Sequence, residues 1–136
     1  MYEETKMQVK PTGFGVSYLL DLYDCEAGVC DDLELNYRFL EKLVDILGMT
    51  RMSQPVVMHG PTKLGEELYP DKAGVSGWVP LIESGIQIHT LEPKRFVTID
   101  IYTCGCFDKD GALKFAIDTY KPKDVEEHLI QRGTKY

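Results

Sequence analysis

The chain has 136 residues, of which 43% are hydrophobic, 27% charged and 10% aromatic, and this composition fits one globular domain over residues 1–136. Its 22 acidic residues outnumber its 15 basic ones, and the net charge of −7 argues against a nucleic-acid partner, which usually needs a basic face. No apolar run approaches the ~20 residues that cross a bilayer, and the first ten residues lack the apolar core of a secretory signal, so we expect a cytoplasmic protein without a membrane partner.

The first part of the chain predicts a strand followed by a helix. Residues 13–24 carry apolar side chains at alternate positions, which is typical of a strand with one buried face. Asp31 and Asp32 then stand where a helix N-cap belongs, and apolar residues follow at helical spacing as far as Leu47. Gly48 occupies the position of a C-cap glycine, so we expect the helix to end there.

The rest of the chain predicts a second helix and five further strands. Residues 60–74 are rich in glycine and proline and indicate a long loop, which in a compact domain usually carries function. Asp108 can cap a helix that runs to about Tyr120, because Pro122 cannot continue it. The further strands are expected at residues 55–59, 75–82, 85–90, 96–104 and 125–131. These elements predict an α+β fold, a two-layer α/β sandwich with two helices on one face of a mainly antiparallel sheet.

The four cysteines, Cys25, Cys30, Cys104 and Cys106, are spaced as C-x4-C and C-x-C. Neither spacing matches the C-x2-C pair of a structural zinc site, and only three histidines are present as further ligands. We therefore expect no metal and four reduced thiols, one of which is available for catalysis.

The strand-rich segment between residues 76 and 106 holds the side chains best suited to chemistry. Each of them also has a structural explanation. The run 83–85 is typical of a tight hairpin turn, His89 of a hydrogen-bonded strand residue, and Cys104 of a small buried side chain. Ser76, between two small residues, fits a packing position. Residue types alone therefore do not distinguish a catalytic segment from a structural one.

The order and spacing of four short motifs in this segment favour catalysis. Together they resemble the prokaryotic S-adenosylmethionine decarboxylase family, and the steps from the first serine to the cysteine match that family without a gap. Weaker similarity extends over most of the chain. The motifs are Gly-Val-Ser-Gly at 74–77, Glu-Ser at 83–84, Ile-His-Thr at 88–90 and Asp-Ile-Tyr-Thr-Cys-Gly at 100–105.

The resemblance implies a proenzyme that cleaves itself between Glu83 and Ser84 into chains 1–83 and 84–136. The Ser84 hydroxyl would attack the Glu83 carbonyl, and elimination and hydrolysis would leave a covalent pyruvoyl group where Ser84 had been. Serine is a weak nucleophile and needs a nearby base and a strained amide, and the family assigns proton handling to the counterpart of His89.

The same resemblance assigns the remaining roles. Ser76 would help to polarise the reacting groups, and the pyruvoyl group would act as an electron sink through a Schiff base with the substrate amine. Cys104 would return a proton to the α-carbon after carbon dioxide leaves. The implied activity is a carboxy-lyase reaction on S-adenosylmethionine, which supplies the aminopropyl donor for spermidine.

The segment after His89 differs from the family pattern, in which an aromatic residue, a proline and a glutamate follow the histidine and threonine. Here Leu91 and Glu92 occupy the corresponding stretch, and we expect them to contact the substrate, with Tyr69 as a replacement aromatic side chain. The family's histidine after the nucleophile is Gly85. Two alternatives therefore stay open: a pyruvoyl-dependent decarboxylase of arginine or ornithine, and a homologue that never cleaves and serves as a binding or regulatory subunit.

The spacing between Ser84 and His89 also predicts an oligomer. Residues five apart on an ideal strand point to opposite faces, so the two side chains are not expected to meet within one chain. The family resemblance also implies a dimer or a larger assembly. We therefore expect a homodimer or higher oligomer in which His89 and Ser76 of one protomer serve Ser84 and Cys104 of another.

Overall fold

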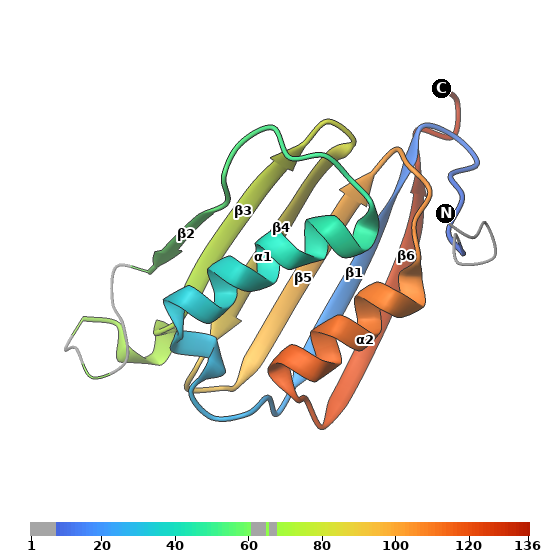
Figure 1. Cartoon of the computed structure of the whole chain (residues 1–136). Helices are drawn as coiled ribbons and strands as arrows, with labels where there is room; N and C mark the ends of the chain where they lie inside the picture. Colours follow the sequence, from blue (N-terminus) through green and yellow to red (C-terminus); the bar gives the residue numbers. More distant parts are fainter. Residues whose placement is uncertain (1–7, 61–64, 66–67) are drawn as a thin grey trace.

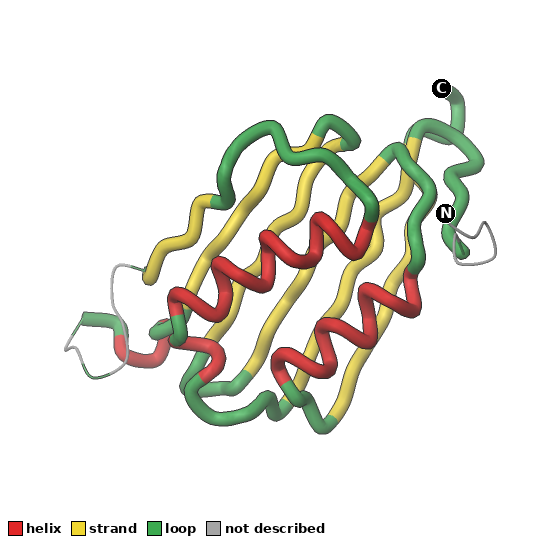
Figure 2. Tube along the Cα trace, viewed as in Figure 1, coloured by secondary structure: helices red, strands yellow, loops and turns green. Residues whose placement is uncertain are grey.

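The fold is known from a computed structural model, which describes residues 8–60, 65 and 68–136. In this part of the chain six antiparallel strands form one sheet, and helices α1 and α2 lie side by side across a single face of it (Figures 1 and 2). The strand order is β2-β3-β4-β5-β1-β6. The strands are β1 (Gly15–Tyr23), β2 (Val56–His59), β3 (Val75–Leu81), β4 (Ser84–Leu91), β5 (Phe96–Thr103) and β6 (Asp124–Arg132). The predicted two-layer α+β architecture is confirmed.

Both helices begin and end at residues that the sequence predicts. In α1 (Leu33–Leu47) the Asp32 side chain accepts a hydrogen bond from the Leu35 N–H, and Gly48 ends the helix in a left-handed conformation. In α2 (Lys109–Tyr120) the Asp108 side chain accepts one from the Gly111 N–H. Two short 3-10 helices, η2 (Val29–Asp31) and η3 (Pro70–Lys72), occupy connections.

Strand alternation gives the sheet two unlike faces. On the face beneath the helices, apolar side chains from the central strands form the core with the inner sides of α1 and α2. The opposite face has no helix over it in the described part of the chain, and it presents Ser76, Trp78, Gln87, His89 and Asp100 to solvent. The chemistry-bearing residues of β3, β4 and β5 therefore lie mainly on the open face.

The long loop predicted over residues 60–74 falls partly on residues 61–64 and 66–67, which lie outside the described residues. No helix in the described residues is long and apolar enough to cross a bilayer.

Candidate active site

Ser84 lies at the first position of β4, directly after the two-residue connection from β3. It has a φ angle of 136°, a conformation that favours glycine and is strained for other residues. Two-residue hairpin loops normally place positive φ angles within the loop itself. Here the positive φ angle belongs to Ser84, the residue after the loop, so backbone strain is concentrated beside the Glu83–Ser84 peptide bond.

The carbonyl of that peptide bond accepts a hydrogen bond from the backbone. The Glu83 oxygen lies 2.9 Å from the Cys104 nitrogen, which follows the end of β5. The Glu83 side chain points elsewhere, because its Oε1 accepts a hydrogen bond from the Thr50 N–H at 3.0 Å. A positioned N–H donor on a carbonyl stabilises negative charge that develops on its oxygen.

The Cys104 backbone is held in place by close packing between β1 and the end of β5. A Cβ atom on Gly15 would lie 2.4 Å from the Thr103 carbonyl oxygen and 3.1 Å from the Cys104 Cα, so only glycine fits there. The buried Thr103 hydroxyl also accepts a hydrogen bond from the Gly105 N–H at 2.9 Å. Sequence reasoning missed Gly15, because a glycine near a strand end gives no sign of what packs against it.

Ser76 and His89 form a second pair at the opposite end of β4. They are direct partners across β3 and β4, and the Ser76 Oγ lies 2.9 Å from the His89 Nδ1 on the open face. At about 3.3 Å per residue, five residues of strand separate the Cα atoms of Ser84 and His89 by roughly 16 Å. Within one chain the structure therefore brings Ser76 to His89 but brings neither of them to Ser84.

A hollow of about 800 Å³ opens on the helix-free face and includes Ser84 in its lining. Aromatic side chains and two charged groups, Asp100 and Arg132, contribute to its walls. Burial and the nearby carboxylate of Asp21 raise the pKa of Asp100 above its usual range. The full lining is Phe14, Ser17, Leu19, Trp78, Ser84, Gly85, Ile86, Gln87, Asp100, Ile101, Tyr102, Ile130 and Arg132.

The four cysteines are free thiols: Cys104 and Cys106 are exposed, and Cys25 and Cys30 are buried. Cys104 is thus accessible at the turn that contacts Glu83, as a proton donor needs to be. Within the described ranges, no group of three or more histidine, cysteine and acidic side chains is arranged to hold a metal ion.

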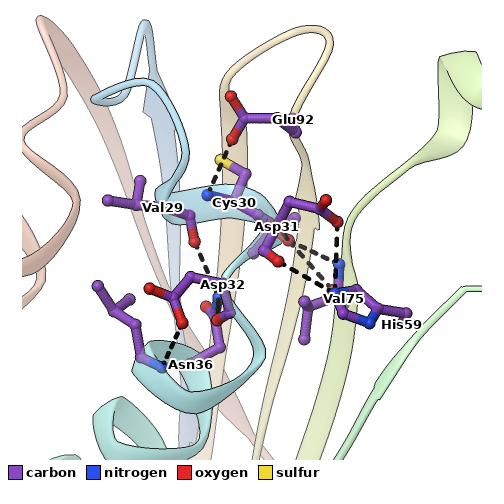
Figure 3. Close-up of polar contacts among 10 residues, drawn as sticks. Val29, Cys30, Asp31, Asp32, Asn36, His59, Val75 and Glu92 are labelled. Atoms are coloured by element: carbon purple, nitrogen blue, oxygen red, sulfur yellow. Dashed lines mark hydrogen bonds and ion pairs between the residues drawn. The ribbon is translucent and has the colours of Figure 1, made fainter. Parts of the chain in front are cut away.

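The residues predicted to contact the substrate lie at the His89 end of the sheet or beyond it. The buried Glu92 carboxylate accepts hydrogen bonds from the N–H groups of Gly28, at 2.9 Å, and Cys30, at 3.1 Å, as Figure 3 shows for Cys30. In this structure Glu92 therefore anchors the start of η2. Leu91 is half-buried at the end of β4, and Tyr69 is 57% exposed at the start of η3.

Comparison with known proteins identifies the family. A family model described as S-adenosylmethionine decarboxylase matches residues 16–133. The chain belongs to this family. An S-adenosylmethionine decarboxylase proenzyme of Persephonella marina is 32% identical, and the match covers 88% of this chain and 83% of the relative. A proenzyme of the same name from Aquifex aeolicus is 31% identical over 88% of this chain and 81% of its own length.

A solved structure supports the same assignment at the level of the fold. The adenosylmethionine decarboxylase of Aquifex aeolicus has a TM-score of 0.71 to this chain at 29% sequence identity. The match covers 92% of this chain and 93% of that one. The family resemblance predicted from the serine, histidine and cysteine spacing is confirmed.

Proposed function

We propose that this S-adenosylmethionine decarboxylase family member is a proenzyme that cuts itself between Glu83 and Ser84 into chains 1–83 and 84–136. The mature protein decarboxylates S-adenosylmethionine and so supplies the aminopropyl donor for spermidine. The observation that carries the proposal is the strained Ser84, whose preceding carbonyl is bound by the Cys104 N–H. The names of the relatives favour this reaction over arginine or ornithine decarboxylation and over a non-cleaving subunit.

The first chemical step is an N-to-O acyl shift. The Ser84 hydroxyl attacks the Glu83 carbonyl carbon, the bond from that carbon to the Ser84 nitrogen breaks, and an ester forms. Negative charge develops on the Glu83 oxygen during the attack, where the Cys104 N–H already lies at 2.9 Å. Strain at Ser84 is relieved when the peptide bond breaks, which lowers the barrier.

The second step removes the ester. Loss of the Ser84 α-proton expels the Glu83 carboxylate, so the bond from the Ser84 Cβ to oxygen breaks and a dehydroalanine remains. Its imine tautomer takes up water and releases ammonia, and a ketone replaces the amine. The resulting pyruvoyl group supplies an electron sink for the decarboxylation. The hollow beside Ser84 receives the substrate, and the exposed Cys104 thiol lies next to the cleavage site, where it supplies a proton to the product.

The active sites are shared between two copies of the chain. The separation of roughly 16 Å along β4 leaves Ser84 without the Ser76–His89 pair of its own chain. The open sheet face carries partly exposed apolar side chains, including Met58, Trp78 and Ile130, which a second sheet can cover. A copy packed face to face in the opposite direction supplies its Ser76 and His89 to Ser84.

Mixing two inactive proenzymes tests the shared site. Denatured Ser84→Ala and His89→Ala chains, refolded together, are expected to regain cleavage and decarboxylation in the mixed dimers, because one of the two sites is complete. Each variant refolded alone is the control and stays inactive. No recovery in a mixture that forms heterodimers contradicts a site built from two chains.

The mass of the purified polypeptide tests the proposed function itself. We expect two fragments that meet at Glu83–Ser84, a blocked N-terminus on the second, and release of carbon dioxide from carboxyl-labelled S-adenosylmethionine. Labelled ornithine and arginine serve as controls for the substrate. An uncut chain of 15.5 kDa supports the binding-subunit alternative.

The free state of all four cysteines fits the reducing cytoplasm, where we place the protein.

A further inference from the structure

We propose that Arg132 receives the α-carboxylate of the substrate. This inference rests on the proposed function and adds a specificity-determining residue to the same site. Arg132 is the last residue of β6 and lines the hollow that contains Ser84. It lies 48 residues after Ser84 and outside every motif on which the family resemblance depends.

The sheet register places Arg132 two strands away from Cys104. Arg132 is the direct partner of Gly15 on β1, and on the other side of β1 the Gly15 Cα packs against the Thr103–Cys104 backbone. Because neighbouring strands lie ~4.8 Å apart, the Cα atoms of Arg132 and Cys104 are separated by about 10 Å. A guanidinium on its long stem spans much of this distance, and Gly15 places no side chain between them.

The guanidinium is held over the hollow by neutral partners. It lies 4.5 Å from the centre of the Tyr102 ring, and its Nη1 donates to the Ser17 hydroxyl at 3.4 Å. Within the described residues Arg132 forms no ion pair with a carboxylate. Its charge is therefore available to a ligand and is oriented before the ligand arrives.

The charges of the hollow match an α-amino acid. Among its described lining residues two carry charge, the basic Arg132 and the acidic Asp100. An amino-acid substrate brings a carboxylate, which a guanidinium binds with two parallel hydrogen bonds, and one or more cationic groups, which a carboxylate attracts. Because the chain is strongly acidic, an arginine without an ion-pair partner in the lining of the hollow also counters the chain's general repulsion of a carboxylate.

The effect of Arg132 on KM and kcat depends on how much charge the substrate carboxylate carries in the bound substrate and in the transition state. The substrate carboxylate is anionic before reaction and leaves as neutral carbon dioxide, so its contact with Arg132 is strongest in the bound substrate. An interaction that is stronger in the bound substrate than in the transition state lowers KM and does not accelerate the chemical step, so its loss raises KM without lowering kcat. The decarboxylated product lacks the carboxylate, and its affinity is therefore independent of Arg132.

A comparison of substrate and product binding in Arg132→Gln tests the proposal. We expect KM for S-adenosylmethionine to rise about tenfold, since a charge-assisted hydrogen bond is lost, and kcat to be no lower than in wild type. The inhibition constant of the decarboxylated product should stay within about twofold. The KM of Arg132→Lys should lie between those of wild type and Arg132→Gln, because lysine keeps the positive charge and lacks the planar guanidinium that binds a carboxylate with two hydrogen bonds. The exposed Lys135→Gln is the matched control and should behave as wild type in every measurement.

Three outcomes overturn the assignment. An unchanged KM removes Arg132 from substrate binding, equal weakening of substrate and product makes its role general packing, and an uncut Arg132→Gln chain places it in self-cleavage. Failure of the proposed function looks different, because the wild-type chain itself then stays uncut and releases no carbon dioxide.

Discussion

Ser84→Ala is expected to remain a single uncut chain of 15.5 kDa that releases no carbon dioxide from S-adenosylmethionine. The substitution removes the hydroxyl that attacks the Glu83 carbonyl, and it removes the oxygen through which the ester would form. The Cys104 N–H still polarises that carbonyl, but no nucleophile remains to attack it. An intact-mass measurement and a denaturing gel read the result directly. Ser53→Ala, at an exposed loop serine, is the matched control and should be cut as fully as wild type.

A second substitution at the same position measures the strain. Ser84→Gly should also stay uncut, yet it should be more stable than Ser84→Ala by about 1 kcal/mol, because glycine adopts a φ of 136° without steric cost. Both variants lack the hydroxyl, so the difference between their free energies of unfolding in urea reports the backbone strain at this position alone. Equal stabilities would show that Ser84 holds no strain, and fragments from either variant would move the cleavage to another residue.

Gly15→Ala is expected to slow self-cleavage by at least tenfold although Gly15 contacts no substrate. The new Cβ would lie 2.4 Å from the Thr103 carbonyl oxygen, so the end of β5 has to move away from β1. Because β5 lies between β1 and β4, this movement pushes Cys104 toward Glu83 and spoils the geometry of the Cys104 N–H on the Glu83 oxygen. Loss of one such donor costs about 3 kcal/mol of transition-state stabilisation in other enzymes. The rate of fragment appearance after refolding checks the prediction. The protein should also lose about 1–3 kcal/mol of stability through overpacking.

Two further variants separate this effect from general destabilisation. Gly48→Ala strains the left-handed C-cap of α1 at a cost of roughly 1–2 kcal/mol, yet it should be cut at the wild-type rate. Cys104→Ala keeps the backbone N–H and should be cut normally, but it lacks the thiol and should turn over poorly. If Gly48→Ala slows cleavage as much as Gly15→Ala does, the Gly15 effect is one of stability rather than position.

Local patterns in the sequence were sufficient to predict the secondary structure. Asp32, Gly48 and Asp108 predict helix ends correctly because capping depends on a few neighbouring backbone groups. Alternation of apolar residues predicts the strand over residues 13–24, because a sheet with one covered face needs period-2 burial. The spacing of Ser84, His89 and Cys104 predicts the family, because it matches the family pattern without a gap.

Local patterns and motif spacing in the chain thus account for the helices and strands, the family and the residues at the proposed cleavage bond. The packed sheet is needed to show that the Cys104 N–H lies on the Glu83 carbonyl, that Gly15 leaves room for this arrangement, and that Arg132 lines the same hollow as Ser84. The structure also shows that Glu92 accepts hydrogen bonds at the start of η2, and that Ser76 is hydrogen-bonded to His89 far from Ser84. These relations depend on the register and order of antiparallel strands, which bring together residues far apart in the chain. No local pattern encodes them, because strand pairing is decided by the packing of the whole sheet against its helices.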